Sequence, residues 1–289
     1  MAIAQSEVVD VDILARAAQP RQLIVTLYGL YARDEGGWLS VASIVSLLGD
    51  LGVDEPSARS SISRLKRRGV LKAERRGVAG YSLSDDGMAM LHEGDHRIFR
   101  QQRARLTDGW LLAVFSVPEE ERSKRHLLRS LLTRLGFGTA APGVWIAPMH
   151  LHGATAKALH DLGLSGYADL FRGDHLASGD LPAKIRSWWD LAGLETLYSS
   201  FLVEHTPAAE RWCDGQVPDD RTAFIGYVRL LTDWRRLPYL DPGLPEELLP
   251  PAWPGIRAAE LFFASKKRWE KPARRYVEKL STFGPAVSR

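Results

Sequence analysis

The sequence of 289 residues contains a single cysteine, Cys213, and no long apolar segment. One cysteine excludes an internal disulfide framework and is typical of a reducing compartment. No stretch approaches the ~20 consecutive apolar residues that are needed to cross a bilayer. The first residues are acidic and lack the basic start and the apolar run of a secretory signal. These absences predict a cytoplasmic protein with no membrane partner.

Short motifs for nucleotide binding and hydrolysis are also absent. The sequence lacks G-x-x-x-x-G-K-[ST], G-x-G-x-x-G, H-E-x-x-H and G-x-S-x-G. His150 and His152 lie close together without a third ligand near them, which is more typical of surface histidines than of a metal site. Cys213 has no histidine close in sequence, so we expect a packed small residue there rather than a nucleophile. We therefore expect no catalytic residue, no metal and no cofactor.

Positive charge is concentrated in one stretch, residues 54–81, with the sequence DEPSARSSISRLKRRGVLKAERRGVAGY. Eight basic and three acidic residues give it a net charge of +5, whereas the whole chain carries only +3. A concentrated basic patch is the electrostatic footprint of phosphate binding. A surface helix with solvated basic side chains is the alternative. The order of the neighbouring elements favours DNA binding over that alternative.

The first half of this stretch has the start, the end and the periodicity of a helix. Asp54 suits the N-cap and Gly69 suits a left-handed end, and a narrow apolar stripe is formed by Ala58, Ile62 and Leu65. The opposite face carries hydroxyl and guanidinium groups. These suit the DNA major groove, because arginine can bridge guanine O6 and N7. The predicted DNA contacts of this recognition helix are Ser57, Arg59, Ser60, Ser63, Arg64, Arg67 and Arg68.

The second half predicts a basic hairpin with a turn at residues 77–80. Its predicted DNA contacts are Lys72, Arg75 and Arg76. Upstream, Pro20 begins a helix, a short strand at Trp38 can pair with the hairpin, and Ser40 can cap a second helix. Helix, strand, helix, turn, recognition helix and hairpin form a winged helix-turn-helix. We predict this DNA-binding domain over residues 20–93, followed by a charged linker over 94–109.

The rest of the chain predicts two further domains, so the fold class is multidomain α+β. Residues 110–178 begin with the apolar strand WLLAVFSV and continue as β-α-β-β-α-β, the ferredoxin-like arrangement. Residues 179–289 are predicted to be helical, with a long helix over 181–206 that bends at Gly193. A proline-rich segment over 238–255 cannot continue a helix, and its leucine and tryptophan content favours an ordered loop.

Together these pieces resemble the phenylacetate-degradation repressor family, the PaaX-type regulators. The segments that carry the resemblance are SARSSISRLKRRGVL with YSLSDDG, then DGWLLAVFSVPEEERSKRHLLRSLLTRLGFGTAAPGVWIAP, then LDPGLPEELLPPAWPG. The resemblance implies a homodimeric repressor that binds double-stranded operator DNA and leaves it when an aryl-CoA thioester, typically phenylacetyl-CoA, binds. It assigns DNA contacts to Arg59, Ser60, Arg64, Arg67, Arg75 and Arg76. The C-terminal domain is expected to serve the effector and dimerisation.

Two alternatives remain open in the sequence. The first is a regulator of the same fold that senses another ligand or a partner protein, because no short motif places the effector site; Trp145, Trp253, Arg229 and Arg235 are of suitable type for a CoA thioester. The second is a nuclease, because the middle domain also resembles the CRISPR spacer-acquisition nuclease. That chemistry needs a carboxylate at the end of the first strand, whereas the first acids here, Glu119 and Glu120, begin a helix.

Overall fold

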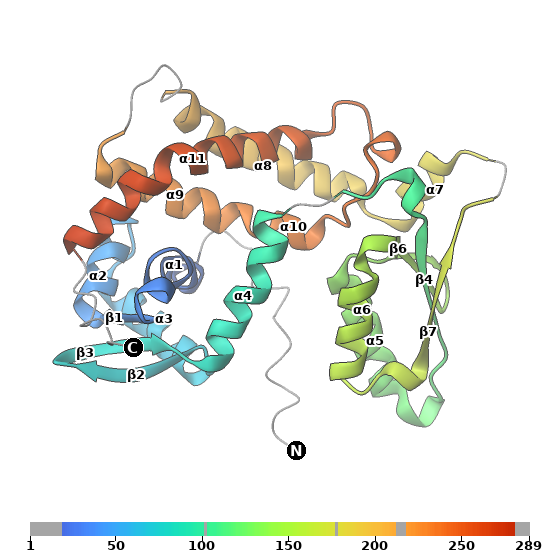
Figure 1. Cartoon of the computed structure of the whole chain (residues 1–289), viewed down its shortest axis with the longest axis horizontal. Helices are drawn as coiled ribbons and strands as arrows, with labels where there is room; N and C mark the ends of the chain where they lie inside the picture. Colours follow the sequence, from blue (N-terminus) through green and yellow to red (C-terminus); the bar gives the residue numbers. More distant parts are fainter. Residues whose placement is uncertain (1–18, 101–102, 177–178, 212–217, 281–289) are drawn as a thin grey trace. The chain divides into compact units, whose positions relative to one another are not determined.

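The computed structural model describes residues 19–100, 103–176, 179–211 and 218–280 (Figure 1). The chain forms two compact units, each assembled from separate segments. Unit 1 comprises Met1–His96, Phe201–Arg236 and Arg257–Arg289, and unit 2 comprises Arg97–Ser200 and Leu237–Ile256. Helices from the end of the chain therefore belong to the same unit as its first helices. None of the described helices combines the length and apolarity that a membrane span requires.

The first part of unit 1 combines helices with a small antiparallel sheet of order β1-β3-β2. Its elements in chain order are α1 (Pro20–Leu27), a π-helical turn (Tyr28–Ala32), β1 (Trp38–Ser40), α2 (Val41–Asp50), α3 (Glu55–Arg67), β2 (Leu71–Arg76), β3 (Val78–Leu83) and α4 (Asp85–Phe99). The predicted order of helices and strands is therefore present. The first helix begins at Pro20, as predicted; its regular α-helical geometry ends at Leu27, and a wider π-helical turn follows.

Local signals explain where α2 and α3 begin. The Ser40 hydroxyl accepts a hydrogen bond from the Ser43 backbone amide at 2.9 Å, and the Asp54 carboxylate accepts one from the Ser57 amide at 2.8 Å. Both are N-caps that satisfy an otherwise unpaired helix donor. Gly69 has a φ of +74° just after α3, as predicted for its left-handed end. The predicted apolar stripe of α3 is buried, with exposed fractions of 5% or less for Ala58, Ile62 and Leu65.

The hairpin of β2 and β3 is longer than predicted. Arg76 pairs with Val78, so only Gly77, with a φ of +75°, lies between the strands, and the predicted turn over 77–80 was wrong. The predicted pairing of the Trp38 strand with the hairpin is confirmed, because β1 pairs with β3. The Trp38 ring covers Gly80 so closely that a Cβ there would lie 2.3 Å from the ring. Only glycine permits this contact.

The second part of unit 1 is helical and has an aromatic core. It includes α9 (Asp220–Trp234) and residues from α8 (Leu191–Glu210) and α11 (Pro254–Leu280). The Trp234 ring stacks on Phe262 with 4.7 Å between centroids and lies 5.7 Å from Phe201. Burial of such rings is a large source of stability, so α9, the second half of α8 and most of α11 form one packed core within unit 1.

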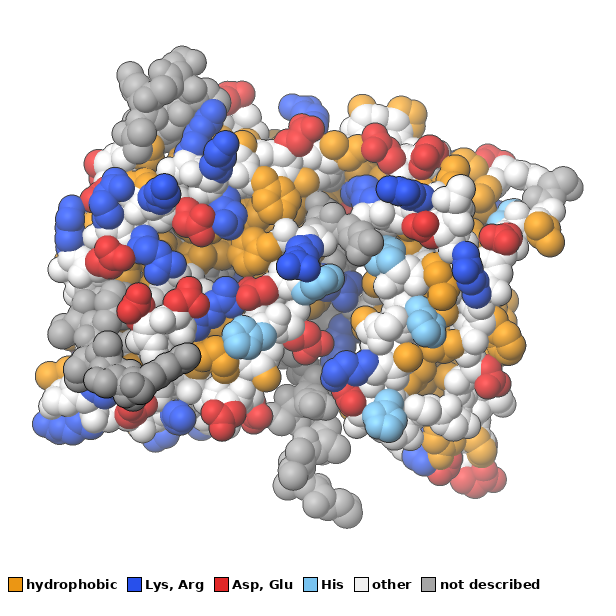
Figure 2. All heavy atoms as spheres, in the orientation of Figure 1, with side chains coloured by type: hydrophobic (Ala, Val, Ile, Leu, Met, Phe, Trp, Pro, Cys, Tyr) orange, Lys and Arg blue, Asp and Glu red, His pale blue; other side chains and the backbone are white. Residues whose placement is uncertain are grey.

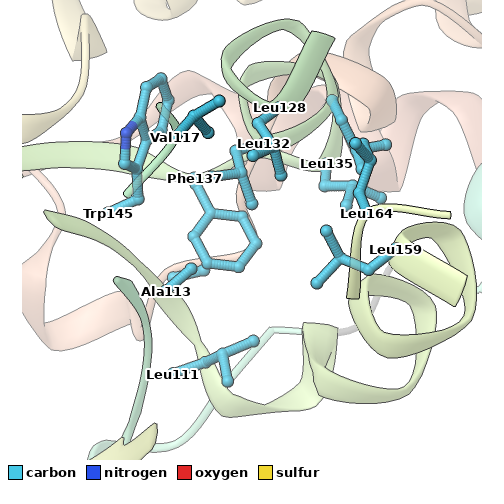
Figure 3. Packing of buried hydrophobic residues seen from close by; sticks show 12 residues of the cluster. Leu111, Ala113, Val117, Leu128, Leu132, Leu135, Phe137, Trp145, Leu159 and Leu164 are labelled. Carbon is cyan, nitrogen blue, oxygen red and sulfur yellow. The ribbon is translucent and has the colours of Figure 1, made fainter. Parts of the chain in front are cut away.

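Unit 2 is built on a four-stranded antiparallel sheet of order β5-β6-β4-β7. Its elements are β4 (Trp110–Phe115), α5 (Arg122–Leu135), β5 (Gly138–Ala141), β6 (Val144–Pro148), α6 (His152–Asp161) and β7 (Ala168–Gly173). Both helices cover one face of the sheet (Figure 1). Side chains from β4, α5 and α6 meet around Phe137 in a buried cluster (Figure 3). The predicted ferredoxin-like arrangement is confirmed.

The predicted single helix over 181–206 was wrong. It is two helices, α7 (Leu181–Trp188) and α8, and the break lies at Trp189–Asp190 rather than at Gly193. The Trp189 backbone is extended, and its indole N–H donates to the Gly136 carbonyl at 2.9 Å. The Asp190 carboxylate accepts from the Gly193 amide at 2.9 Å and so caps the start of α8.

The proline-rich segment is ordered, as its apolar content predicted, and a buried carboxylate holds it. Asp241 is only 7% exposed. Its carboxylate accepts hydrogen bonds from the Arg103 guanidinium at 2.9 Å, the Tyr198 hydroxyl at 2.8 Å and the Gly243 amide at 2.8 Å. Arg97 donates to the carbonyls of residues 135, 238 and 239. Two arginines of the charged segment predicted as a linker are thus bound within unit 2.

Candidate nucleic-acid interface

The outward face of α3 carries most of the residues predicted to contact DNA. Ser57 is half-buried at the first turn, whereas the other predicted contacts of this helix are exposed: Arg59, Ser60, Ser63, Arg64, Arg67 and Arg68. The buried stripe on the opposite side of α3 fixes this orientation, because it is packed into the core of unit 1. The structure therefore brings the hydroxyl and guanidinium groups together on one solvent-facing surface.

The arginines of α3 differ in whether their guanidinium group is paired with a carboxylate of the protein. Arg59 Nε lies 2.7 Å from a Glu55 carboxylate oxygen, an exposed ion pair one turn apart. In the described part of the chain, the side chains of Arg64 and Arg67 have no hydrogen-bond or ion-pair partner. The Ser57 backbone amide holds the pKa of the Asp54 carboxyl below its usual range, so the cap is negatively charged at neutral pH. Arg64 and Arg67 are the charges most available to an anionic ligand.

The hairpin presents Lys72 and Arg75 to solvent but holds Arg76. The Arg76 side chain is 19% exposed, and its Nε lies 2.7 Å from a Glu74 carboxylate oxygen. It also donates to the Gly36 carbonyl at 3.2 Å and lies over the Trp38 ring. Hydrogen bonds from Arg76 and from a serine hydroxyl hold the pKa of Glu74 below its usual range. Arg76 thus braces the hairpin against the segment before β1.

A carboxylate at the end of α2 joins this surface to the C-terminal helices of unit 1. Asp50 accepts hydrogen bonds from the Arg221 guanidinium at 2.9 Å and from the Tyr276 hydroxyl at 2.6 Å. Burial, followed by the hydrogen bond to Asp50, raises the pKa of Tyr276. A carboxylate at a helix C-terminus opposes the helix dipole, so these contacts offset an unfavourable position. Nothing in the local sequence around Asp50 pointed to this role.

Further hydrogen bonds connect α9 with α1 and α2. The hydroxyls of Thr26 and Thr232 are buried and lie 2.8 Å apart. Arg229 donates to the Leu51 carbonyl and Arg235 to the Gln22 carbonyl, each at 3.2 Å. The sequence had suggested Arg229 and Arg235 as types that could bind CoA phosphates, whereas in the structure both hold carbonyls of unit 1. The helices that support α3 are therefore fastened to α9.

An effector site is not defined by these residues. Trp145 and Trp253, the two tryptophans of suitable type, are buried, at 5% and 3% exposure. Unit 1 has a cavity of about 270 Å³ lined by Tyr31, Glu35, Arg274, Val277 and Glu278. Sites for drug-sized ligands occupy roughly 300–1,000 Å³, so we do not assign a CoA thioester to this cavity. Cys213 lies outside the described residues.

Two of the three glutamates that follow β4 are engaged in ion pairs. Glu119 lies 3.0 Å from Arg125, and Glu121 lies 2.9 Å from Lys124. Both pairs lie at the start of α5, where the helix dipole also stabilises carboxylates. Among the residues that the structure describes, no three or more His, Cys, Asp or Glu side chains form a group that could hold a metal ion. His150 and His152 therefore belong to no such group.

Comparison with known proteins assigns successive parts of the chain to one family. "PaaX-like protein" matches residues 19–87, "PaaX protein central Cas2-like domain" matches 103–185, and "PaaX-like protein C-terminal domain" matches 189–279. The chain is 29% identical over 246 residues to the transcriptional repressor PaaX of Escherichia coli (strain K12), covering 83% of this chain and 77% of that relative. The solved structure of the uncharacterised protein Rv0674 from Mycobacterium tuberculosis matches with a TM-score of 0.54 at 22% identity, covering 86% of this chain and 99% of that one. This last likeness shows a shared fold.

These matches and the domain arrangement define the class of the protein as a transcriptional repressor with a Cas2-like central domain. The three matched segments span most of the described sequence in the same order as in the family. The chain belongs to the PaaX-like family. The resemblance found in the sequence segments around α3, β4 and the proline-rich loop is confirmed.

Proposed function

We propose that this repressor binds double-stranded operator DNA through a winged helix-turn-helix over residues 20–93, with α3 as the recognition helix and the β2–β3 hairpin as the wing. One observation carries the proposal: the solvent-facing side of α3 bears Arg64 and Arg67 without an internal partner, beside small hydroxyl side chains. An arginine that donates hydrogen bonds to guanine O6 and N7 discriminates between sequences, and short hydroxyl side chains allow close approach to the DNA backbone. Exposed Lys72 and Arg75 of the hairpin add phosphate contacts.

A homodimer would present two such helices to the DNA. Two-fold symmetry places the recognition helices in successive major grooves about 34–36 Å apart, or a multiple of that distance, on a palindromic operator. In this proposal residues 94–109 connect the DNA-binding domain to the ferredoxin-like domain at 110–178. Residues 179–289 then supply effector binding and dimerisation.

The proposed effector is an aryl-CoA thioester, phenylacetyl-CoA, and the proposed target is an aromatic-acid catabolic operon. The family to which the chain belongs supports this choice. Release from DNA requires that the thioester bind more tightly to a conformation in which the two recognition helices no longer fit the operator. A different ligand or a partner protein that meets the same condition would produce the same response, so the effector is a separate claim from DNA binding.

An enzymatic function is not part of the proposal. Of the glutamates that follow β4, Glu119 and Glu121 are paired with Arg125 and Lys124, and all of them lie at the start of α5 rather than at the end of β4, where a metal near a phosphodiester would need a carboxylate. The E. coli relative is named a repressor. A regulator therefore explains the exposed basic face of α3 better than a nuclease does.

The test is a comparison of two charge-matched variants. Arg64→Gln/Arg67→Gln removes two charges from α3, and Arg122→Gln/Arg129→Gln removes two from exposed positions on α5 of unit 2. Binding to a duplex from the protein's own promoter and to a shuffled duplex is measured by fluorescence anisotropy at fixed salt. We expect the α3 variant to lose its preference for the promoter duplex and the α5 variant to keep it. Equal preference in both variants would reject α3 as the reading element.

A further inference from the structure

A second basic segment lies near the end of the chain, in α11. Residues 266–279 contain seven basic and two acidic residues, a net charge of +5. Residues 54–81 carry another +5, so the remaining sequence of this +3 chain has a net charge of −7. Both basic segments belong to unit 1. A net excess of positive charge is thus found in two stretches that fold into the same compact unit, while the rest of the sequence is net acidic.

Several of these basic side chains are neutralised within unit 1. Lys266 lies 2.9 Å from Glu270, one turn along the helix. Arg275 and Lys279 share the Asp220 carboxylate at 2.7 and 2.9 Å, and hold its pKa below the usual range. These contacts fasten α11 to the start of α9. They account for part of the charge without any external partner.

Two exposed lysines of the segment have no carboxylate partner in the described part of unit 1. Lys267 and Lys271 are exposed, and neither has an ion-pair or hydrogen-bond partner in the described ranges. They are one helical turn apart, so their like charges face each other and are unfavourable in the free protein. Trp269 and Phe262 are buried at 3% and 0% exposure, which fixes the lysine face of α11 toward solvent. Lysine and arginine side chains gather along this part of α11 (Figure 2).

The character of this surface favours phosphate over a protein partner. Two exposed apolar side chains of α11, Phe263 at 37% and Leu280 at 41%, flank this segment, whereas every exposed residue between them is charged or small. Protein–protein interfaces are depleted in lysine and depend on buried aromatic or apolar anchors. Lysine, by contrast, is a flexible point charge that suits a phosphate backbone and releases condensed counterions when it binds.

We propose that Lys267 and Lys271 of α11 bind backbone phosphates of DNA that flanks the operator, outside the segment contacted by α3. The proposal rests on the DNA-binding function proposed above and adds a second, sequence-independent contact surface to it. Because α3 and α11 belong to one unit, a contact at α11 moves with the recognition helix. This contact extends the length of DNA that the protein covers, and it raises affinity without adding base recognition.

The experiment uses full-length protein and two duplexes, one limited to the operator and one extended by about two helical turns, roughly 20 base pairs, on each side. Affinity is measured at several salt concentrations for wild type, for Lys267→Gln/Lys271→Gln, and for the control Lys157→Gln/Lys184→Gln. The control removes the same charge from exposed positions of unit 2. Glutamine keeps helix propensity, and circular dichroism with a thermal melt verifies that each variant is folded.

We expect wild type to bind the extended duplex more tightly and with a steeper salt dependence than the short one. Two phosphate contacts correspond to about 1.8 units of slope, so on the extended duplex the ratio of wild-type to variant affinity should be roughly tenfold larger at about 50 mM salt than at about 200 mM. Its binding to the short duplex should equal that of wild type. An unchanged slope on the extended duplex, or an equal loss in the control, would overturn the proposal. If wild type showed no specific binding to either duplex, that result would instead reject the DNA-binding function itself.

Discussion

The carboxylate of Asp50 offers the sharpest structural test, because it joins the helix before α3 to the C-terminal helices. Asp50→Ala removes the acceptor for the Tyr276 hydroxyl at 2.6 Å and for the Arg221 guanidinium at 2.9 Å. Asp50 is the last residue of α2, and the short turn that follows leads to the N-cap of α3. Loss of these contacts should therefore affect both stability and the position of α3.

The magnitude follows from how exposed each partner is. The Arg221 side chain is 56% exposed, so that ion pair is screened by water and contributes little to stability. The Tyr276 hydroxyl donates to a mostly buried carboxylate, and a hydrogen bond to a charged group contributes about 1.5 kcal/mol or more. We expect Asp50→Ala to lower the free energy of unfolding by about 2 kcal/mol.

Urea denaturation of full-length variants measures this loss, and a double-mutant cycle isolates the pair. Asp50→Ala, Tyr276→Phe and the double variant should give a coupling energy of about 1 kcal/mol. Arg221→Ala alone should cost much less stability than Asp50→Ala. Operator affinity of Asp50→Ala, measured where the variant is fully folded, should fall several-fold. A coupling energy near zero together with unchanged operator affinity would refute the role assigned to Asp50.

Three further predictions concern single side chains. Arg64→Ala should cost about 1–3 kcal/mol of operator binding and relax preference at one base pair, whereas an equal loss on all sequences would make Arg64 a phosphate contact. Arg75→Ala should lower the salt slope by about one unit, while Arg76→Ala should instead lower the melting temperature, because Arg76 is bound within unit 1; the reverse pattern would contradict this assignment. Burial, with Arg97 adding to it, lowers the pKa of His150 from its ordinary value of 6.5, so the unfolded chain takes up the proton first and stability falls as pH drops through 6.5. His150→Gln should lose less stability between about pH 7.5 and about pH 5.5 in urea titrations, and a loss equal to that of wild type would exclude the histidine as the cause.

Elements with local signals could be predicted from the sequence. Asp54 and Gly69 define the ends of α3 because capping depends on residues within one turn of the helix end. The apolar run at β4 predicted a buried strand; Leu111 and Ala113 are buried under the helices, whereas Val114 is 38% exposed, so the prediction was right for one face of the strand. The burial of the apolar stripe of α3 followed from its spacing alone.

Elements set by distant partners could not be predicted. The helix break at Trp189 depends on its hydrogen bond to Gly136, a residue that is far away in the sequence. The same reason applies to Arg76, whose partner carbonyl belongs to Gly36, and to Asp50, which binds residues of α9 and α11. Periodicity reports which face of an element is apolar, but it carries no information on which remote group will meet a given charge.

The most direct test of the proposed function is the affinity of the purified full-length protein for its own promoter, measured by fluorescence anisotropy at fixed salt with and without phenylacetyl-CoA. The proposal predicts tight binding that prefers the promoter over random DNA and that the thioester releases. Tight, specific binding that ignores the thioester would contradict the effector and leave the repressor. No preference over random DNA would contradict the assignment of α3 and the hairpin as an operator-reading surface.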